Sequence, residues 1–210
     1  TIQPYSPAAG TGLSSHELNK PGCYRDVKDT TVTAQFLMLD PKEEMTAWGK
    51  PYFLAWTTTP WTLAANSALC VGPNIDYVAV QTYNPYTGEP ITVVIAEARL
   101  GAYFNPAGEQ AELADYKKGD KVIPYKVIAR YKGADLVGMK YEQLLPMISP
   151  MTDGAFRVIP GDYVTTEDGT GIVHIAPAFG EEDSKVFKGT GIPAVEPMDA
   201  ECKFTKEVSD

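Results

Sequence analysis

The chain has 210 residues, of which 21% are charged and 44% are apolar, so it has the composition of a globular protein rather than of a disordered one. Its net charge of −9 argues against a domain that grips a nucleic-acid duplex by its phosphates, because that grip needs clustered Lys and Arg. Three widely spaced cysteines and two histidines lack the ligand spacing of a zinc site, so no metal is expected. Neither a membrane-spanning run nor a signal peptide is recognisable, and the sparse cysteines fit a cytoplasmic protein.

The first part of the chain differs from the rest in composition. Residues 1–30 are rich in Pro, Gly, Ser and Thr, which predicts an extended arm or linker, with Tyr24 and Val27 as candidate anchors. Residues 31–210 carry the regular patterns of a single domain. Because the chain opens without Met and ends in a charged run, we expect a piece of a larger protein.

Short strands dominate the predicted structure. Period-2 alternation or β-branched and aromatic content predicts strands over 32–38, 51–58, 76–82, 91–95, 121–131, 156–159 and 172–176. The turn-forming connector 84–88 predicts a hairpin between the third and fourth of these. Helices are predicted over 96–104, 109–118 and 181–188, the last two ended by Gly119 and Gly189, whereas 133–145 has a mixed pattern. The expected fold is α+β, mostly β: a closed or nearly closed barrel decorated with helices.

The first motif with chemical content is WTTTPWTL at residues 56–63. Thr59 before Pro60 is a favourable helix start, with Thr59 as N-cap and Pro60 at the first helical position. A strand that enters a capped turn would explain that pair, but not further hydroxyls on Thr57 and Thr58. Alternation places Thr57 and Thr59 on one side of the strand end and Thr58 on the other. Hydroxyls and helix N–H groups without a strong base suit recognition of a ribose or an ester better than proton abstraction.

The second motif is GTGIVHIAPAFGEED at residues 169–183. Its glycines precede a strand, whereas a dinucleotide-binding loop follows one, and the Lys of a phosphate loop is absent. Alternation places Ile172, His174 and Ala176 on one face of the strand and Val173 and Ile175 on the other. A helix is then expected to begin with three acids in its first turn, Glu181, Glu182 and Asp183. The alternative interpretation is a hydrogen-bonded core histidine and acids that only complement the helix dipole.

The two motifs together resemble the editing (CP1) insertion of isoleucyl-tRNA synthetase. The run PGCYRDVKD at residues 21–29 supports the likeness, which extends over essentially the whole chain. Thr59 stands where valyl and leucyl editing domains typically carry Arg, and this favours the isoleucyl family. Ala64 and Glu182 stand where Pro and Asp are common. The nucleotide-binding signatures of a synthetase core are absent, as in an insertion taken from a larger chain.

The resemblance implies a β-barrel domain that receives the 3′ end of aminoacylated tRNA(Ile) and hydrolyses valine wrongly esterified to it, or valyl-adenylate. An editing site separate from the aminoacylation site is needed because one methylene contributes only about 1–3 kcal/mol to the free energy of binding. Isoleucyl-tRNA synthetase is the usual example of this limit. The parent ligase charges tRNA(Ile) with isoleucine and uses ATP and Mg²⁺. This piece would need no cofactor and would act as a monomer joined to the remainder of the synthetase.

Residue roles follow from the same resemblance. Asp183 would hold the α-ammonium group of the substrate, which suits a carboxylate that is ionised at neutral pH. Thr57, Thr58 and Thr59 would be the catalytic hydroxyls that position the ester and a water molecule, with no covalent intermediate. His174 would form a wall that blocks the extra methylene of isoleucine. The residues expected to bind substrate are Thr62, His174, Gly171 and Trp61.

Other interpretations stay open at this point. The domain would also fit a module that positions the tRNA 3′ end without hydrolysis, or an editing domain of the related valyl and leucyl enzymes. A carrier for a small apolar ligand fits less well, because its pocket would be mainly apolar. Cys70 lacks a nearby histidine and is not expected to be a nucleophile, and the indoles of Trp56 and Trp61 are expected to pack rather than to stack on bases.

Overall fold

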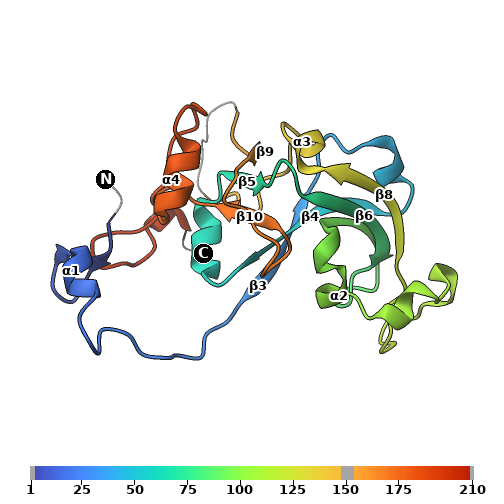
Figure 1. Ribbon diagram of the computed structural model, residues 1–210, viewed down its shortest axis with the longest axis horizontal. Coiled ribbons are helices and arrows are strands. Elements are labelled where there is room, and N and C mark those ends of the chain that lie inside the picture. Colours follow the sequence, from blue (N-terminus) through green and yellow to red (C-terminus); the bar gives the residue numbers. More distant parts are fainter. Residues whose placement is uncertain (1–2, 148–153, 209–210) are drawn as a thin grey trace.

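The computed structural model describes residues 3–147 and 154–208, and two β-sheets form its centre (Figure 1). The larger sheet has the strand order β3-β4-β7-β6-β8. Its members are β3 (Val32–Leu37), β4 (Lys50–Thr57), β6 (Asp76–Tyr83), β7 (Pro90–Ala96) and β8 (Lys126–Lys132). Only β4 and β7 pair in parallel, and β6 and β7 form the predicted antiparallel hairpin. The predicted strand over 121–131 begins only at Lys126.

The smaller sheet lies between α4 and the larger sheet and has the order β10-β5-β9 (Figure 1). Its strands are β5 (Ala68–Val71), β9 (Arg157–Pro160) and β10 (Ile172–Ile175). Strand β5 was not predicted, because all four of its residues are buried and it therefore shows no alternation. It pairs in parallel with β9 and antiparallel with β10, which places β10 beside the end of β4.

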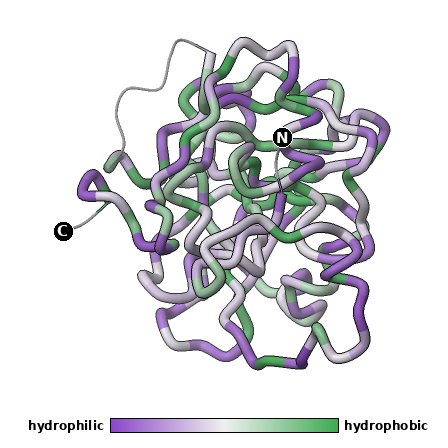
Figure 2. Tube along the Cα trace, turned by 90° about the vertical axis from the view of Figure 1, so that its left-hand side faces the viewer, coloured by the Kyte–Doolittle hydropathy of each residue, from purple (hydrophilic) through white to green (hydrophobic). Residues whose placement is uncertain are grey.

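The predicted α+β, mostly β class is confirmed, but the described strands do not close into one hydrogen-bonded barrel. Instead, residues 138–142 join the two sheets at one corner. Met38 forms a single antiparallel bridge with Tyr141, and Lys140 forms one with Arg157. A shared apolar core fills the space between the sheets and includes Phe36, Phe53, Leu69, Tyr141 and Ile172. The apolar segments accordingly run through the middle of the trace, whereas polar ones gather in the outer loops (Figure 2).

Helices are short and peripheral. The α-helices are α1 (Ser15–Leu18), α2 (Leu100–Tyr103), α3 (Gly133–Leu136) and α4 (Glu181–Phe187). Short 3₁₀ helices span Glu43–Thr46, Pro60–Ala65, Glu97–Arg99, Pro106–Glu109, Leu113–Asp115 and Lys206–Val208. Among the described residues, no helix is long and apolar enough to cross a membrane.

The helix predicted over 109–118 is wrong. This stretch is a loop that follows the 3₁₀ turn Pro106–Glu109 and contains the turn Leu113–Asp115, and tertiary contacts hold the backbone of this region. The carbonyl oxygen of Leu113 accepts a hydrogen bond of 2.8 Å from the Tyr83 hydroxyl. Tyr125 N–H likewise donates to the Gly108 carbonyl oxygen at 3.1 Å. Contacts with the sheet therefore override the local helical tendency of the acidic residues.

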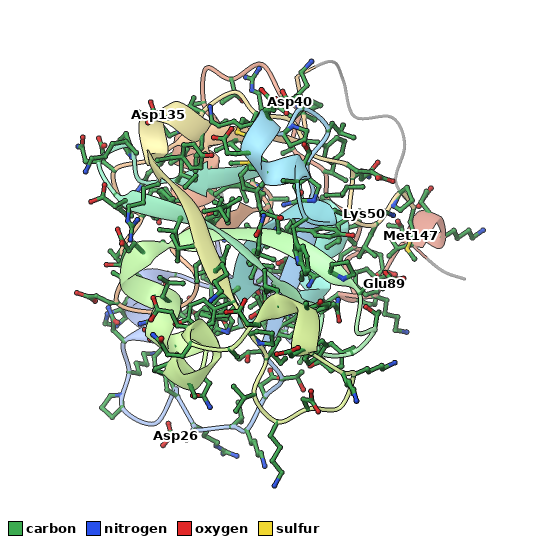
Figure 3. All side chains as sticks on the ribbon, turned by 90° about the vertical axis from the view of Figure 1, so that its right-hand side faces the viewer. Asp26, Asp40, Lys50, Glu89, Asp135 and Met147 are labelled. Atoms are coloured by element: carbon green, nitrogen blue, oxygen red, sulfur yellow. The ribbon has the colours of Figure 1, made fainter. Side chains whose placement is uncertain are left out.

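The N-terminal arm contains a small hairpin of β1 (Tyr5–Ser6) and β2 (Thr11–Gly12), followed by α1. The chain then runs without regular structure to β3. Tyr24 and Val27 are 74% and 78% exposed, so the prediction that they anchor the arm is wrong. Asp26, between them, lies at the outer edge of the molecule in Figure 3.

Candidate active site

The two sequence motifs meet at a pocket of about 400 Å³ where the end of β4 approaches β10. Its volume lies in the range of small-molecule sites. Every candidate residue from the sequence lines this pocket: Thr57, Thr58, Thr59, Trp61, Thr62, Gly171, His174 and Asp183. Segments more than a hundred positions apart in the chain are thus brought together around one cavity.

Three threonine hydroxyls form a connected cluster at the end of β4. Thr57 Oγ1 lies 3.2 Å from Thr59 Oγ1, which in turn lies 3.3 Å from Thr62 Oγ1. Thr59 N–H donates to Thr57 Oγ1 at 3.1 Å. Thr57 and Thr62 are buried, whereas Thr58 is exposed at the mouth of the pocket. As predicted, Thr57 and Thr59 share one side of the strand end.

The turn after the cluster differs in detail from the prediction. Thr59 and Pro60 do occupy the N-cap and first positions, but of a 3₁₀ helix. The Thr59 side chain makes no capping hydrogen bond, so the prediction of a side-chain cap is wrong. Its hydroxyl lies toward Thr57 and Thr62 instead, where the cluster offers it polar partners.

His174 is held at both ring nitrogens. Its Nε2 lies 2.9 Å from Thr62 Oγ1, and its Nδ1 lies 2.8 Å from Asn66 Nδ2. Asn66 is in turn bonded to the Ala68 carbonyl oxygen and the Tyr141 hydroxyl. Burial lowers the pKa of His174 to about 4, so the ring is neutral at pH 7. The histidine is therefore a hydrogen-bonded buried residue and also lines the pocket. The two interpretations of the sequence, a core histidine and a pocket residue, are thus compatible.

Asp183 lies across the pocket in the first turn of α4. Its Oδ2 accepts a hydrogen bond of 2.9 Å from Ala176 N–H. Among the described residues, no Lys, Arg or His forms an ion pair with it. Burial raises the pKa of this carboxyl, partly offset by the Ala176 N–H, and the nearby Glu182 raises it further. The sequence offered no cause for such a shift beyond the neighbouring acids, because burial is a property of the fold.

The glycines of the second motif let its loop approach the larger sheet. Gly171 has a φ of +75°, and a Cβ atom there would lie 2.5 Å from the Cβ of Ala96. Gly169 has a φ of +64°, and its Cβ would meet the ring of Trp56 at 3.0 Å. The Gly171 carbonyl oxygen also accepts from the buried Tyr77 hydroxyl at 2.5 Å. Glycine is therefore required at both positions.

The two tryptophans lie differently. Trp56 is half-buried, which agrees with the expected packing role. Trp61 is 42% exposed at the rim, so the expectation that it packs is wrong. Together with Phe179 it also lines a second, larger depression between the N-terminal hairpin and residues 196–204. Its position is open to a ligand that enters the first pocket.

Several pocket residues were not found from the sequence. Tyr163 lines the pocket, and its hydroxyl is buried without a hydrogen-bond partner in the part of the chain that the structure describes. It lies near Cys70, whose pKa is raised by burial to about 11, so this thiol stays protonated. Other missed lining residues are Val164, Thr165, Asp168, Thr170 and Phe179.

The arrangement defines what chemistry the pocket can support. Its lining has hydroxyls and the carboxyl groups of Asp168 and Asp183. The histidine is neutral and both of its ring nitrogens are engaged, so the described lining lacks a nucleophile paired with a free histidine base. It is therefore suited to binding a small ligand with a cationic group and hydroxyls, and to orienting a water molecule.

The fold matches solved structures of a CP1 domain and of a leucyl-tRNA synthetase editing domain. The CP1 domain structure named GlLeuRS-CP1 aligns with 76% of this chain and 59% of its own, with a TM-score of 0.53 and 18% identity. The Plasmodium knowlesi (P. knowlesi) cytosolic leucyl-tRNA synthetase editing domain aligns with 73% of this chain and 60% of its own, with a TM-score of 0.52 and 13% identity. The chain thus has the fold of a CP1 editing domain.

Sequence relatives identify the particular family. The isoleucine–tRNA ligase of Bacteroides fragilis is 72% identical over 93% of this chain, and that of Porphyromonas gingivalis is 64% identical over 96%. The Cytophaga hutchinsonii ligase is 57% identical over the entire chain. No protein-family model matches. The chain belongs to the isoleucyl-tRNA synthetase family and spans only 17% to 20% of the length of these relatives.

Proposed function

We propose that this chain hydrolyses valine wrongly esterified to tRNA(Ile), as the editing part of an isoleucine–tRNA ligase. The observation that carries the proposal is the pocket itself. A cluster of hydroxyls and a carboxylate without a cationic partner in the described structure face one cavity, although the sequence separates them widely. An aminoacyl ester of a ribose offers a matching cation, hydroxyls and carbonyl.

Asp183 is the proposed anchor of the substrate α-ammonium group. Asp183 is half-buried and has no cationic partner among the described residues, so a cationic ligand would gain a charge-assisted hydrogen bond and favour the ionised carboxylate. The alternative role of Asp183 as a general base draws some support from its raised pKa. However, Ala176 N–H already occupies Oδ2, which leaves the other oxygen for a ligand.

The threonine cluster is proposed to position the ester and the attacking water. Thr57, Thr58 and Thr59 line the cavity on the side of the 3₁₀ turn. None of them has an adjacent free base, so they act as hydrogen-bonding groups rather than as nucleophiles. The free ribose hydroxyl of the tRNA is the proposed proton relay, and no covalent intermediate with the enzyme forms.

His174 is proposed to provide size selection. The ring borders the cavity and is fixed at both nitrogens, so it yields little to an extra methylene. A wall that resists displacement excludes isoleucine and admits valine. Gly171, Thr62 and Trp61 complete the proposed substrate contacts at the strand start, the turn and the rim.

The test is a deacylation assay with the purified 210-residue chain. Valyl-tRNA(Ile) and isoleucyl-tRNA(Ile) are incubated separately with the chain, and amino-acid release is compared with the spontaneous rate. We expect faster release of valine and unchanged release of isoleucine. Binding without release of valine would instead support a module that only positions the tRNA 3′ end. Hydrolysis of both esters at the same rate would contradict the size sieve.

A further inference from the structure

Tyr141 lies behind the pocket wall, on the segment that joins the two sheets. It is 1% exposed, and its hydroxyl donates to Asn66 Oδ1 at 2.6 Å. On the other end of the amide, Asn66 Nδ2 donates to the Ala68 carbonyl oxygen at 3.0 Å. A carbonyl oxygen only accepts, and the phenol proton needs an acceptor, so both contacts identify the same orientation of the Asn66 amide.

That orientation determines the protonation of His174. The second N–H of the Asn66 amide is directed at His174 Nδ1 at 2.8 Å, so Nδ1 must present a lone pair. In a neutral imidazole the proton then resides on Nε2, which donates to Thr62 Oγ1 at 2.9 Å. The hydrogen bond at one ring nitrogen thus selects the tautomer at the other.

We propose that Tyr141 is a positioning residue of the pocket: through Asn66 it holds His174 in the Nε2–H tautomer and in one ring orientation. The tautomer and orientation of His174 are inferred from the hydrogen bonds alone. Their role in excluding isoleucine by size rests on the proposed function. Tyr141 makes this contact from 75 positions away in the sequence, across the junction of the two sheets. Tyr141 thus takes part both in the junction of the two sheets and in the hydrogen bonds that hold His174.

The tautomer has a consequence for the threonines. Because Nε2–H donates to Thr62 Oγ1, the Thr62 proton is free for the Thr59 carbonyl oxygen at 2.8 Å. Thr59 must then be the donor in its contact with Thr62, and Thr57 the donor in its contact with Thr59. All three hydroxyl protons are consumed inside the cluster. The lone pairs that remain suit a ligand that donates hydrogen bonds, such as a water molecule or a ribose hydroxyl.

Nitrogen NMR of the histidine rings tests the assignment directly. The chain has only two histidines, so ¹⁵N-histidine labelling gives two sets of ring signals, and His16→Gln identifies those of His174. At pH 7 we expect a protonated Nε2 and an unprotonated Nδ1 in His174. Tyr141→Phe should shift these signals toward a mixture of tautomers. A protonated Nδ1 in the unaltered chain, or identical signals in Tyr141→Phe, would overturn the proposal.

Tyr83→Phe is the matched control. It removes one tyrosine hydroxyl, which donates to the Leu113 backbone carbonyl at 2.8 Å, and Tyr83 does not line the pocket. We expect it to leave the His174 signals unchanged. If Tyr141→Phe does not fold, Asn66→Asp tests the link through which Tyr141 acts, because a carboxylate only accepts hydrogen bonds and should move the ring proton to Nδ1. An unprotonated Nδ1 in that variant would overturn the proposal.

The consequence for selectivity is measured separately. Tyr141→Phe should raise hydrolysis of isoleucyl-tRNA(Ile) relative to valyl-tRNA(Ile) by roughly 2- to 10-fold, the equivalent of one neutral hydrogen bond. Tyr83→Phe should leave that ratio unchanged. Altered ring signals with an unaltered ratio would overturn the role in selectivity. If the unaltered chain hydrolyses neither ester, the proposed function fails, while the NMR result still decides whether Tyr141 positions His174.

Discussion

Thr62 and His174 are 112 positions apart in the chain, yet Thr62 Oγ1 lies 2.9 Å from His174 Nε2 in a buried contact. The first residue belongs to the turn after β4, and the second belongs to β10. Their contact connects the hydroxyl cluster to the wall of the pocket. It is a direct hydrogen bond between the two motifs of the sequence.

Replacing His174 by alanine should enlarge the pocket and weaken its selectivity. We expect His174→Ala to hydrolyse isoleucyl-tRNA(Ile) measurably. The change also removes the hydrogen bonds that His174 makes with Asn66 and Thr62 and leaves one buried polar group unpaired on each, which should lower the free energy of unfolding by about 1–3 kcal/mol. Deacylation rates and urea unfolding measure both effects. His16→Ala, on the exposed arm, is the control, and retained exclusion of isoleucine in His174→Ala would argue against the wall.

Asp183→Asn should remove most of the hydrolysis of valyl-tRNA(Ile). The amide keeps the shape of the side chain but loses the charge-assisted bond to an ammonium group, which is worth about 1.5–3 kcal/mol or roughly 10- to 150-fold in rate. The control is Glu182→Gln on the same helix, whose carboxylate is exposed and pairs with Lys185. Single-turnover deacylation compares the two. A rate within twofold of the unaltered chain would eliminate Asp183 as the anchor.

Stability should depend on pH through His174. Its pKa is about 4 in the folded chain and 6.5 in the unfolded one, so the unfolded state binds more protons between these values. The free energy of unfolding should therefore decrease as the pH falls from 6.5 to 4, by about 3 kcal/mol at most. The raised pKa of Asp183 acts in the opposite direction. Urea unfolding of His174→Gln isolates the histidine contribution, since that variant should show a flatter profile; an equally steep one would contradict it.

Gly171→Ala should destabilise the fold more than Gly189→Ala does. Both glycines have positive φ values, +75° and +87°, so both substitutions strain the backbone. Only at Gly171 does the new Cβ also meet another atom, the Cβ of Ala96 at 2.5 Å, whereas Gly189 has open space. We expect about 1–3 kcal/mol of additional loss for Gly171→Ala. Equal thermal shifts in the two variants would show that the loop has room to move.

The isolated chain should bind whole tRNA weakly. Its net charge of −9 repels the phosphate backbone, so the affinity must come from elsewhere in the synthetase. We expect a dissociation constant no tighter than about 10⁻⁴–10⁻⁶ M at physiological salt, the range of nonspecific contacts. Fluorescence anisotropy with labelled tRNA(Ile) measures it. Nanomolar binding by this chain alone would contradict the expectation.

Local patterns predicted most strands and the helix after the second motif, because alternation and capping act over a few residues. The hairpin of β6 and β7 and the helix α4 are of this kind. The hydroxyl cluster was also visible, since four threonines crowd one turn. The helix predicted over 109–118 was wrong because tertiary contacts determine the backbone conformation there. Strand β5 was missed because all of its residues are buried, so its sequence shows no alternation of apolar and polar residues.

Long-range partners were not visible. Asn66 occurs at the end of a turn, and Tyr141 occurs in a segment of mixed pattern. Neither has a local signal that relates it to a histidine on another strand. The burial that raises the pKa of Asp183 is likewise a result of packing between elements. Residues that contact the pocket-lining side chains from behind are brought there by the tertiary structure, so the sequence does not reveal them. Residues within a compact motif can be recognised from their spacing.

The corner formed by residues 138–142 has a consequence for biosynthesis. The hydroxyls of the first motif leave the ribosome well before the strand of His174 and the helix of Asp183, and Tyr141 emerges between them. A growing chain therefore carries half of a pocket for as long as the later segments remain in the exit tunnel. The pocket is therefore complete only when α4, which carries Asp183, has docked against the strands.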